Sequence, residues 1–222
     1  MDSHLYDNLL ILAFAGHARS GKDTAVSFIL DLKDNETARS LYNLSDKDYI
    51  KVLRFADPIK ESVAAAMKDM IGTNSVSAAR TIIERYKDKN IKYNNVDIRQ
   101  AMQQTGTFYR YQDKDFFVNS MIKKIESTLN WFTDGHKIII LIPDTRFENE
   151  VELMRETFKD SYKLIKIDNP KINEQVKKGL PPYDHESEKH IDNLDADLVI
   201  KNDSDLETLK ARVLKAFYIY NA

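Results

Sequence analysis

The hydrophobic positions of the chain alternate between short apolar runs and longer stretches with helical spacing. Apolar runs predict five strands, at 9–15, 49–55, 137–142, 162–167 and 197–200. Helical spacing predicts helices over 21–32, 57–72, 77–86, 98–105, 113–128, 147–158 and 206–218. The polar segment 34–48 is expected to be a connection. Strands that alternate with helices predict an α/β fold with a parallel sheet, right-handed crossovers and ligands at the carboxyl ends of the strands.

The first apolar run leads into the glycine-containing segment GHARSGKDT at 16–24. The spacing from Gly16 to Gly21-Lys22 is that of a P-loop, in which backbone N–H groups and a helix N-terminus surround a polyphosphate and the lysine reaches the β and γ phosphates. Asp23 stands where Ser or Thr usually binds Mg²⁺, and Thr24 follows it, so the metal contact is assigned to one or the other. An accidental match is disfavoured because the strand before the loop and the helix after it are both expected.

Composition narrows the class of protein. The chain has 222 residues, 42% hydrophobic and 31% charged, which suits one globular domain with insertions. A net charge of -2 without a dense Lys/Arg cluster argues against a duplex-binding surface, although a small anion needs only a few local cations. The absence of cysteine excludes disulfides and cysteine metal sites. The N-terminal segment has no basic start and its apolar run is too short to span a bilayer, so we expect a soluble, cytoplasmic protein.

Polar side chains follow two of the predicted strands. Asp144 comes directly after the run 137–142, where P-loop enzymes place a carboxylate near Mg²⁺, although it would also suit a helix N-cap. Arg146 would point a guanidinium at the same edge, for bidentate phosphate binding or for an ion pair with Glu148, Glu150 or Asp144. Asn202 follows the fifth strand, where it is expected to contact an adenine or to begin a turn that caps the last helix.

A helix between the second and third strands carries a second set of candidates. Arg99 and Gln103 share one helical face, Gly106 is expected to end the helix, and Arg110 lies just beyond it. Two arginines and an amide on one side suit a monophosphate and the edge of a base, and a solvated helix face explains the pattern equally well.

The polar connection 168–193 is long for a compact domain, which is typical of a flap or a disordered segment. Within it, a cluster of His and Glu superficially resembles a metal site, formed by His185, Glu186, Glu188 and His190. This spacing without cysteine favours a solvated polar turn instead.

With these pieces in order, the sequence resembles the deoxynucleoside monophosphate kinases of tailed bacteriophages, a branch of the P-loop nucleoside monophosphate kinases. The resemblance rests on six segments, which occur in the family's order between residues 11 and 209: GHARSGKDT, FADPIK, RQAMQQTGTFYR, PDTRFENE, HESE and IKNDSDLETL. It implies a three-layer P-loop kinase fold over 1–222, with a five-stranded parallel sheet flanked by helices, a helical acceptor-binding region at 73–130 and a lid at 168–193. It also implies transfer of the ATP γ-phosphate to a dNMP with Mg²⁺, which feeds DNA synthesis, in the host cytoplasm if a phage encodes the chain.

The resemblance also assigns roles to residues. The catalytic residues would be Lys22, Asp144 and Arg146. ATP would be held by Gly16, Arg19, Ser20, Gly21, Lys22, Asp23, Thr24 and Asn202. The metal would be held by Asp23, Thr24 and Asp144. The dNMP would be held by Lys60, Arg99, Gln103, Gly106, Arg110 and Arg146. The lid lacks arginine, so a catalytic cation from it would be Lys171, Lys177, Lys178 or Lys189.

Two other functions remain in view at this point. One is a P-loop kinase of another small phosphorylated acceptor, of the phosphomevalonate or dephospho-coenzyme A type. The other is a P-loop switch protein that binds ATP and acts on a partner, against which the arginine-bearing helix and the lid argue, because a switch needs no second phosphate grip. No direct nucleic-acid binding and no membrane contact are expected, and the aromatic segment 216–222 is a candidate for core packing or for a homodimer interface.

Overall fold

The computed structural model describes residues 6–69, 72–86, 92–93, 96–132, 136–179 and 186–222. The chain divides into two compact units. The sheet unit consists of Met1–Arg54 and Ile122–Ala222, and the helical unit of Phe55–Met121. The helical unit includes most of the expected acceptor-binding region 73–130.

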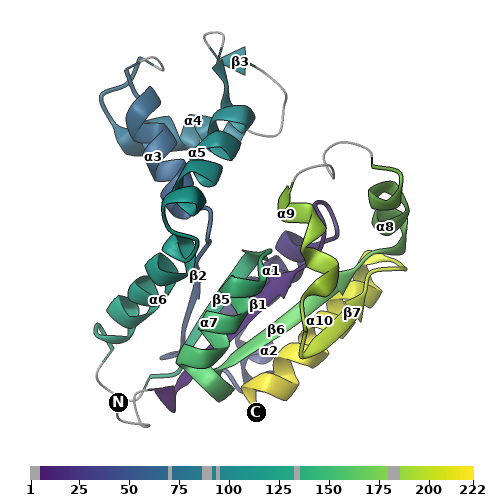
Figure 1. Ribbon diagram of the computed structural model, residues 1–222. Helices are drawn as coiled ribbons and strands as arrows, with labels where there is room; N and C mark the ends of the chain where they lie inside the picture. The colour runs from purple at the N-terminus through teal and green to yellow at the C-terminus, as the bar shows by residue number, and fades with distance from the viewer. Residues whose placement is uncertain (1–5, 70–71, 87–91, 94–95, 133–135, 180–185) are drawn as a thin grey trace. The chain divides into compact units, whose positions relative to one another are not determined.

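The sheet unit contains five parallel strands in the order β2-β5-β1-β6-β7 (Figure 1). They are β1 (Leu9–Ala15), β2 (Tyr49–Val52), β5 (Ile138–Thr145), β6 (Tyr162–Asp168) and β7 (Leu198–Lys201). The central strand β1 pairs with β5 on one side and β6 on the other, and all seven of its residues are buried. The structure therefore confirms the expected α/β fold with a five-stranded parallel sheet flanked by helices.

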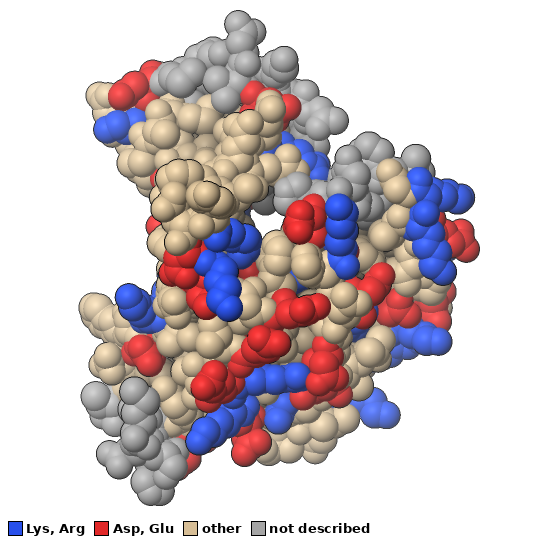
Figure 2. Space-filling model, viewed as in Figure 1, with Lys and Arg blue, Asp and Glu red and all other residues tan. Residues whose placement is uncertain are grey.

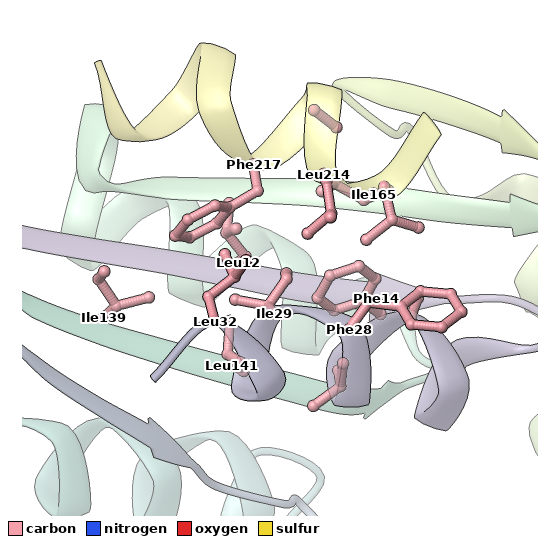
Figure 3. Close-up of a cluster of buried hydrophobic side chains, with 14 of the residues drawn as sticks. Leu12, Phe14, Phe28, Ile29, Leu32, Ile139, Leu141, Ile165, Leu214 and Phe217 are labelled. Atoms are coloured by element: carbon pink, nitrogen blue, oxygen red, sulfur yellow. The ribbon is translucent and has the colours of Figure 1, made fainter. Parts of the chain in front are cut away.

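Two helices cover one face of this sheet. They are α1 (Lys22–Leu30) and α10 (Leu206–Asn221), which extends past the expected end at 218. Successive strand residues point to opposite faces, so Leu12 and Phe14 share the face that these helices cover. Burial of each large apolar side chain there contributes about 1.5–3 kcal/mol. Figure 3 shows side chains of both helices pointing toward those of β1, namely Phe28 and Ile29 of α1 and Leu214 and Phe217 of α10.

The opposite face is covered by α7 (Glu148–Phe158), which the right-handed crossover from β5 to β6 places there. Its buried apolar side chains are Val151, Met154 and Phe158. On the face of the molecule drawn in Figure 2, acidic and basic side chains are interspersed over the sheet unit, in keeping with the mixed charge of the sequence. In the described part of the chain, none of the helices has both the length and the apolarity that crossing a bilayer would need.

The expected connection 34–48 was wrong in part, because it contains a helix. The short 3₁₀ helix η2 (Asp31–Asp34) is followed by α2 (Glu36–Leu41). Asn35 caps α2, since its side-chain oxygen accepts from the Ala38 N–H at 2.9 Å. None of the α2 residues is buried, which explains why hydrophobic periodicity gave no signal.

Strand β5 continues beyond the predicted end at 142 and includes Pro143 and Asp144. Proline is tolerated because the β1–β5 register shifts between Ala13 and Ala15, beside it. The N-cap explanation of Asp144 was therefore wrong: α7 begins at Glu148, after Phe147 at the N-cap position. By contrast, β2 ends at Val52, earlier than the predicted 55.

The described residues of the expected flap 168–193 contain helices, and its role as a lid stays a prediction. The helices are α8 (Pro170–Lys177), α9 (Glu186–Lys189) and the 3₁₀ helix η4 (Ile191–Asn193). Ile191 and the following Leu194 are buried. His185, one of the four residues of the suspected metal cluster, lies outside the described residues.

The helical unit is built from α3 (Asp57–Met67), α4 (Val76–Tyr86), the hairpin β3 (Lys92–Tyr93) and β4 (Val96–Asp97), α5 (Ile98–Gln112) and the start of α6 (Phe116–Leu129). Helix α3 ends before the predicted stop at Gly72. The apolar core of the unit consists of Val63, Ala64, Met67, Ala79, Ile83 and Ile98.

The prediction that Gly106 ends its helix was wrong. Helix α5 continues through Gly106 to Gln112, and Gly106 is buried. A Cβ atom at this position would lie 3.1 Å from Ile59 Cδ1 of α3. Gly106 therefore permits close packing of α3 against α5, which local sequence patterns do not distinguish from a helix stop.

Candidate active site

The glycine loop joins β1 to α1 at the carboxyl end of the central strand. Gly16 and Gly21 have φ angles of 144° and 109°. A Cβ atom at Gly16 would lie 2.6 Å from the Ile167 carbonyl oxygen, and one at Gly21 would lie 2.7 Å from Asn202 Nδ2. Both positions therefore require glycine for conformation and for space. Arg19, between them, is exposed and has a φ of 65°.

The loop presents hydrogen-bond donors that the described residues do not use. Gly21 is the N-cap of α1, and no described side chain caps this helix end. Ser20 is buried, and its Oγ has no hydrogen-bond partner within the described ranges. A helix N-terminus with free N–H groups and a buried hydroxyl suits a phosphate group.

Lys22 is buried in this loop. Its Nζ donates to the carbonyl oxygens of Gly16 at 2.6 Å and His17 at 2.7 Å. The pKa of Lys22 is lowered to about 8, first by burial and second by the nearby Arg146 guanidinium, against the opposite effect of Glu188, Asp23 and Asp144. Desolvation and a neighbouring cation thus disfavour the ammonium form, which an anionic ligand would restore.

The two candidate metal-binding carboxylates differ in exposure. Asp144 is half-buried near the end of β5, close enough to Lys22 to raise the pKa of the ammonium. Asp23 is 78% exposed and accepts from Arg54 Nη2 at 2.9 Å. Thr24 is half-buried in the first turn of α1. Within the described ranges no three His, Asp or Glu side chains form a metal-binding group by themselves. Mg²⁺ is commonly held by one or two carboxylates plus substrate phosphates, so these residues fit a magnesium-bound polyphosphate.

Arg146 has a partner that the sequence did not predict. Its guanidinium Nη1 donates to Glu188 and, at 3.0 Å, to Ser187 Oγ. The expected partners were Asp144, Glu148 and Glu150; Glu150 accepts instead from the backbone N–H of Arg146 at 2.8 Å.

Glu188 also contacts the glycine loop. Its Oε2 accepts from the Ala18 N–H at 2.9 Å and lies 3.2 Å from His17 Nδ1. Burial opposes its ionisation, but the His17 hydrogen bond, Arg146, the Ala18 N–H and Lys22 together lower its pKa to about 2. The expected solvated turn is therefore wrong for Glu188, which is 3% exposed. Sequence reasoning missed its role because its partners are distant in the chain: Ala18 is 170 residues away and Arg146 is 42 residues away, and no local pattern indicates them.

Asn202 supports the glycine loop from the end of β7. Its Nδ2 donates to the Ser20 carbonyl oxygen at 2.8 Å, and its backbone N–H to the Asp168 carbonyl oxygen at 2.7 Å. The N-cap of α10 is Asp205, which accepts from the Thr208 N–H at 2.7 Å. Asn202 is thus not the helix cap, and its contact with adenine stays a prediction.

Helix α5 carries the second set of candidates, in the helical unit. Because α5 is continuous, Arg99, Gln103, Gly106 and Arg110 follow one helical stripe. The Arg110 guanidinium carbon lies 4.6 Å from the centroid of the Phe117 ring. Gln103 also borders a shallow hollow of about 430 Å³, lined further by Gln104, Thr107, Phe108 and Tyr111.

Lys60, the remaining candidate of the helical unit, is 4% exposed. Its Nζ lies 2.5 Å from Glu84 Oε1. The structure thus assigns Lys60 a partner within its own unit, and its contact with substrate stays a prediction.

The structure brings one set of expected residues together in the sheet unit: the loop from Gly16 to Thr24 with Asp144, Arg146 and Asn202. The other set belongs to the helical unit.

Comparison with known proteins adds to this geometry: a family model, described as deoxynucleotide monophosphate kinase, matches residues 42–213. The chain belongs to this family. The deoxynucleotide monophosphate kinase match begins after the glycine loop, so the P-loop assignment rests on the loop's own sequence and geometry.

Other comparisons are less informative than the family match. No curated protein matches the chain. The crystal structure of TT1252 from Thermus thermophilus is similar over 95% of this chain and 96% of that chain, with 14% sequence identity and a TM-score of 0.41.

Proposed function

We propose that this protein transfers the γ-phosphate of ATP to a deoxynucleoside monophosphate and so forms a deoxynucleoside diphosphate for DNA synthesis. One observation carries the proposal: in a chain of the deoxynucleotide monophosphate kinase family, a buried lysine in a glycine loop lies near Asp144 and Arg146. Lys22 would neutralise charge on the transferring phosphate, and the N-terminus of α1 would hold the phosphates of ATP.

Mg²⁺ would neutralise and orient the phosphate oxygens. The residues proposed to hold it are Asp144 and one of Asp23 and Thr24. Little covalent chemistry is required of the protein in phosphoryl transfer, so these side chains would act by positioning and electrostatic stabilisation.

The acceptor would be bound by α5. Arg99 and Arg110 suit a monophosphate, and Gln103 can donate and accept in one plane at the edge of a base. Lys60 would have to exchange its contact with Glu84 to join the two arginines of α5. Arg146, in the sheet unit, would supply a cation for the phosphate in transfer at the glycine loop. A cation from the proposed lid would be one of its four lysines, Lys171, Lys177, Lys178 and Lys189.

A coupled assay of ADP release tests the proposal. ATP and Mg²⁺ would be combined with dAMP, dGMP, dCMP or dTMP, with their ribose counterparts, and with phosphomevalonate and dephospho-coenzyme A. We expect release that depends on one or more deoxynucleotides. ADP release only with phosphomevalonate or dephospho-coenzyme A would show that the acceptor is not a nucleotide. ATP binding without ADP release in the presence of any acceptor would favour a switch protein.

A further inference from the structure

Glu188 connects three segments that are distant in the chain. One carboxylate oxygen accepts from the Ala18 N–H and lies near the His17 ring, and the other accepts from Arg146. Ala18 and His17 belong to the glycine loop, and Arg146 directly follows β5. The side chain of one glutamate from α9 thus joins the phosphate-binding loop to a candidate phosphate-binding arginine.

The charges explain why an anion is needed at this place. Arg146 is close enough to Lys22 to lower the pKa of the lysine, so two cations lie near each other at the glycine loop. Among the groups that raise the pKa of Lys22, Glu188 has the largest effect. Glu188 is 3% exposed, and a buried charge without its partner is strongly unfavourable, so the Glu188 carboxylate holds the half-buried Arg146 guanidinium against it.

The segment that carries Glu188 is fixed in the sheet unit. Ser187, Ile191 and Leu194 are buried around it. A second carboxylate of the same segment, Asp192, lies 3.3 Å from His17 Nε2 and 3.5 Å from Lys166 Nζ. This anchoring favours a permanent support over an anion that leaves when phosphate binds.

We propose that Glu188 is a positioning residue that holds the Arg146 guanidinium beside the glycine loop for use on the phosphates of ATP. The inference rests on the proposed function, since it takes the glycine loop as the ATP site. Glu188 itself touches no reacting atom; it acts through Arg146.

The test is a double-mutant cycle with Glu188→Gln, Arg146→Ala and the double variant. Each single variant should lower kcat/KM on the order of 100-fold, the loss typical of a misplaced phosphate clamp. The double variant should be no worse than Arg146→Ala within about twofold. Glu186→Gln is the matched control: it makes the same change in the same helix at a side chain that is 72% exposed, and it should leave activity unchanged.

Chemical rescue separates positioning from a merely structural role. Free guanidinium ion at low concentration should raise the kcat/KM of Arg146→Ala by about tenfold, because the Glu188 carboxylate is still present to bind the ion. The same ion should not restore the double variant. Equal rescue of both variants, a fully additive cycle, or a Glu188→Gln variant as active as Glu186→Gln would overturn the proposal.

Two further measurements keep the inference testable. If Glu188→Gln does not fold, Ser187→Ala is used in its place, since it removes only the second acceptor of Arg146. It should lower kcat/KM by less than Arg146→Ala does, and it should have no effect on kcat/KM in a protein that already carries Arg146→Ala. If the wild-type protein transfers no phosphate, the proposed function fails by itself. The same double-mutant cycle is then measured with MgATP affinity in place of kcat/KM. Glu188→Gln and Arg146→Ala should each weaken MgATP binding, and their effects should not add in the double variant. Tighter MgATP binding by Glu188→Gln would show that Glu188 is an anion that phosphate displaces, and would refute the positioning role.

Discussion

Binding of MgATP should take up a proton at Lys22. The pKa of this lysine is lowered from 10.5 to about 8 in the folded protein, first by burial and then by Arg146. At pH 8 about half of the free molecules therefore carry a neutral Lys22, and at pH 7 only about a tenth do. Bound phosphates stabilise the ammonium and raise its pKa again, so binding should take up about 0.5 proton at pH 8 and about 0.1 at pH 7.

The same shift fixes the sign of two pH dependences. MgATP affinity should fall with rising pH, approaching about tenfold per unit above pH 8, because binding then requires a proton from solvent. The free energy of unfolding of the free protein should instead rise with pH. Below pH 8 the folded protein contains a buried ammonium, which destabilises it by a constant amount. Between about pH 8 and 10.5 Lys22 is neutral in the folded protein but still protonated in the unfolded chain, so the free energy of unfolding increases through this range.

Titration calorimetry in buffers of different ionisation enthalpy measures the uptake directly. Lys22→Arg serves as the control, because arginine stays protonated throughout this range and its binding should involve no uptake. A wild-type protein that binds MgATP at pH 8 without proton uptake, and with equal affinity at pH 7 and pH 9, would refute the account of Lys22.

Three further predictions concern single substitutions. Gly16→Ala places a Cβ 2.6 Å from the Ile167 carbonyl oxygen at a φ of 144°, so we expect loss of MgATP binding by at least about 100-fold, measured by calorimetry; binding within threefold of wild type would contradict the loop geometry. Gly106→Leu should destabilise the helical unit by about 1–3 kcal/mol in urea unfolding, whereas Gly106→Ala should be nearly neutral because its Cβ meets only the tip of Ile59. Asp144→Asn should lower kcat about 100-fold or more with an unchanged circular dichroism spectrum, and full activity would remove Asp144 from the site.

The sheet and its glycine loop could be predicted because their signals are local. Apolar runs of strand length mark β1, β5 and β6, and a fixed spacing of Gly16, Gly21 and Lys22 marks the loop. Where a signal was ambiguous, the prediction failed. A glycine in a helical pattern indicates a stop or a close helix contact, and only the packing of Gly106 on Ile59 distinguishes them.

The contacts of Glu188 show what sequence reasoning could not reach. The motif around it is polar, and polar residues in a long connection are usually solvated. Its burial results from partners that the parallel sheet brings together, the loop after β1 and the residue after β5. Such long-range pairing depends on topology and not on spacing, so it becomes visible only in the folded chain.

The most direct test of the central claim follows the phosphate itself. The protein would be incubated with Mg²⁺, a deoxynucleoside monophosphate and ATP labelled with ¹⁸O in its γ-phosphate, and the products separated by mass spectrometry. The account predicts a deoxynucleoside diphosphate that carries the label, in an amount equal to the ADP formed, and no such product with Lys22→Ala. Labelled inorganic phosphate with unchanged monophosphate would contradict it and would identify an ATP hydrolase.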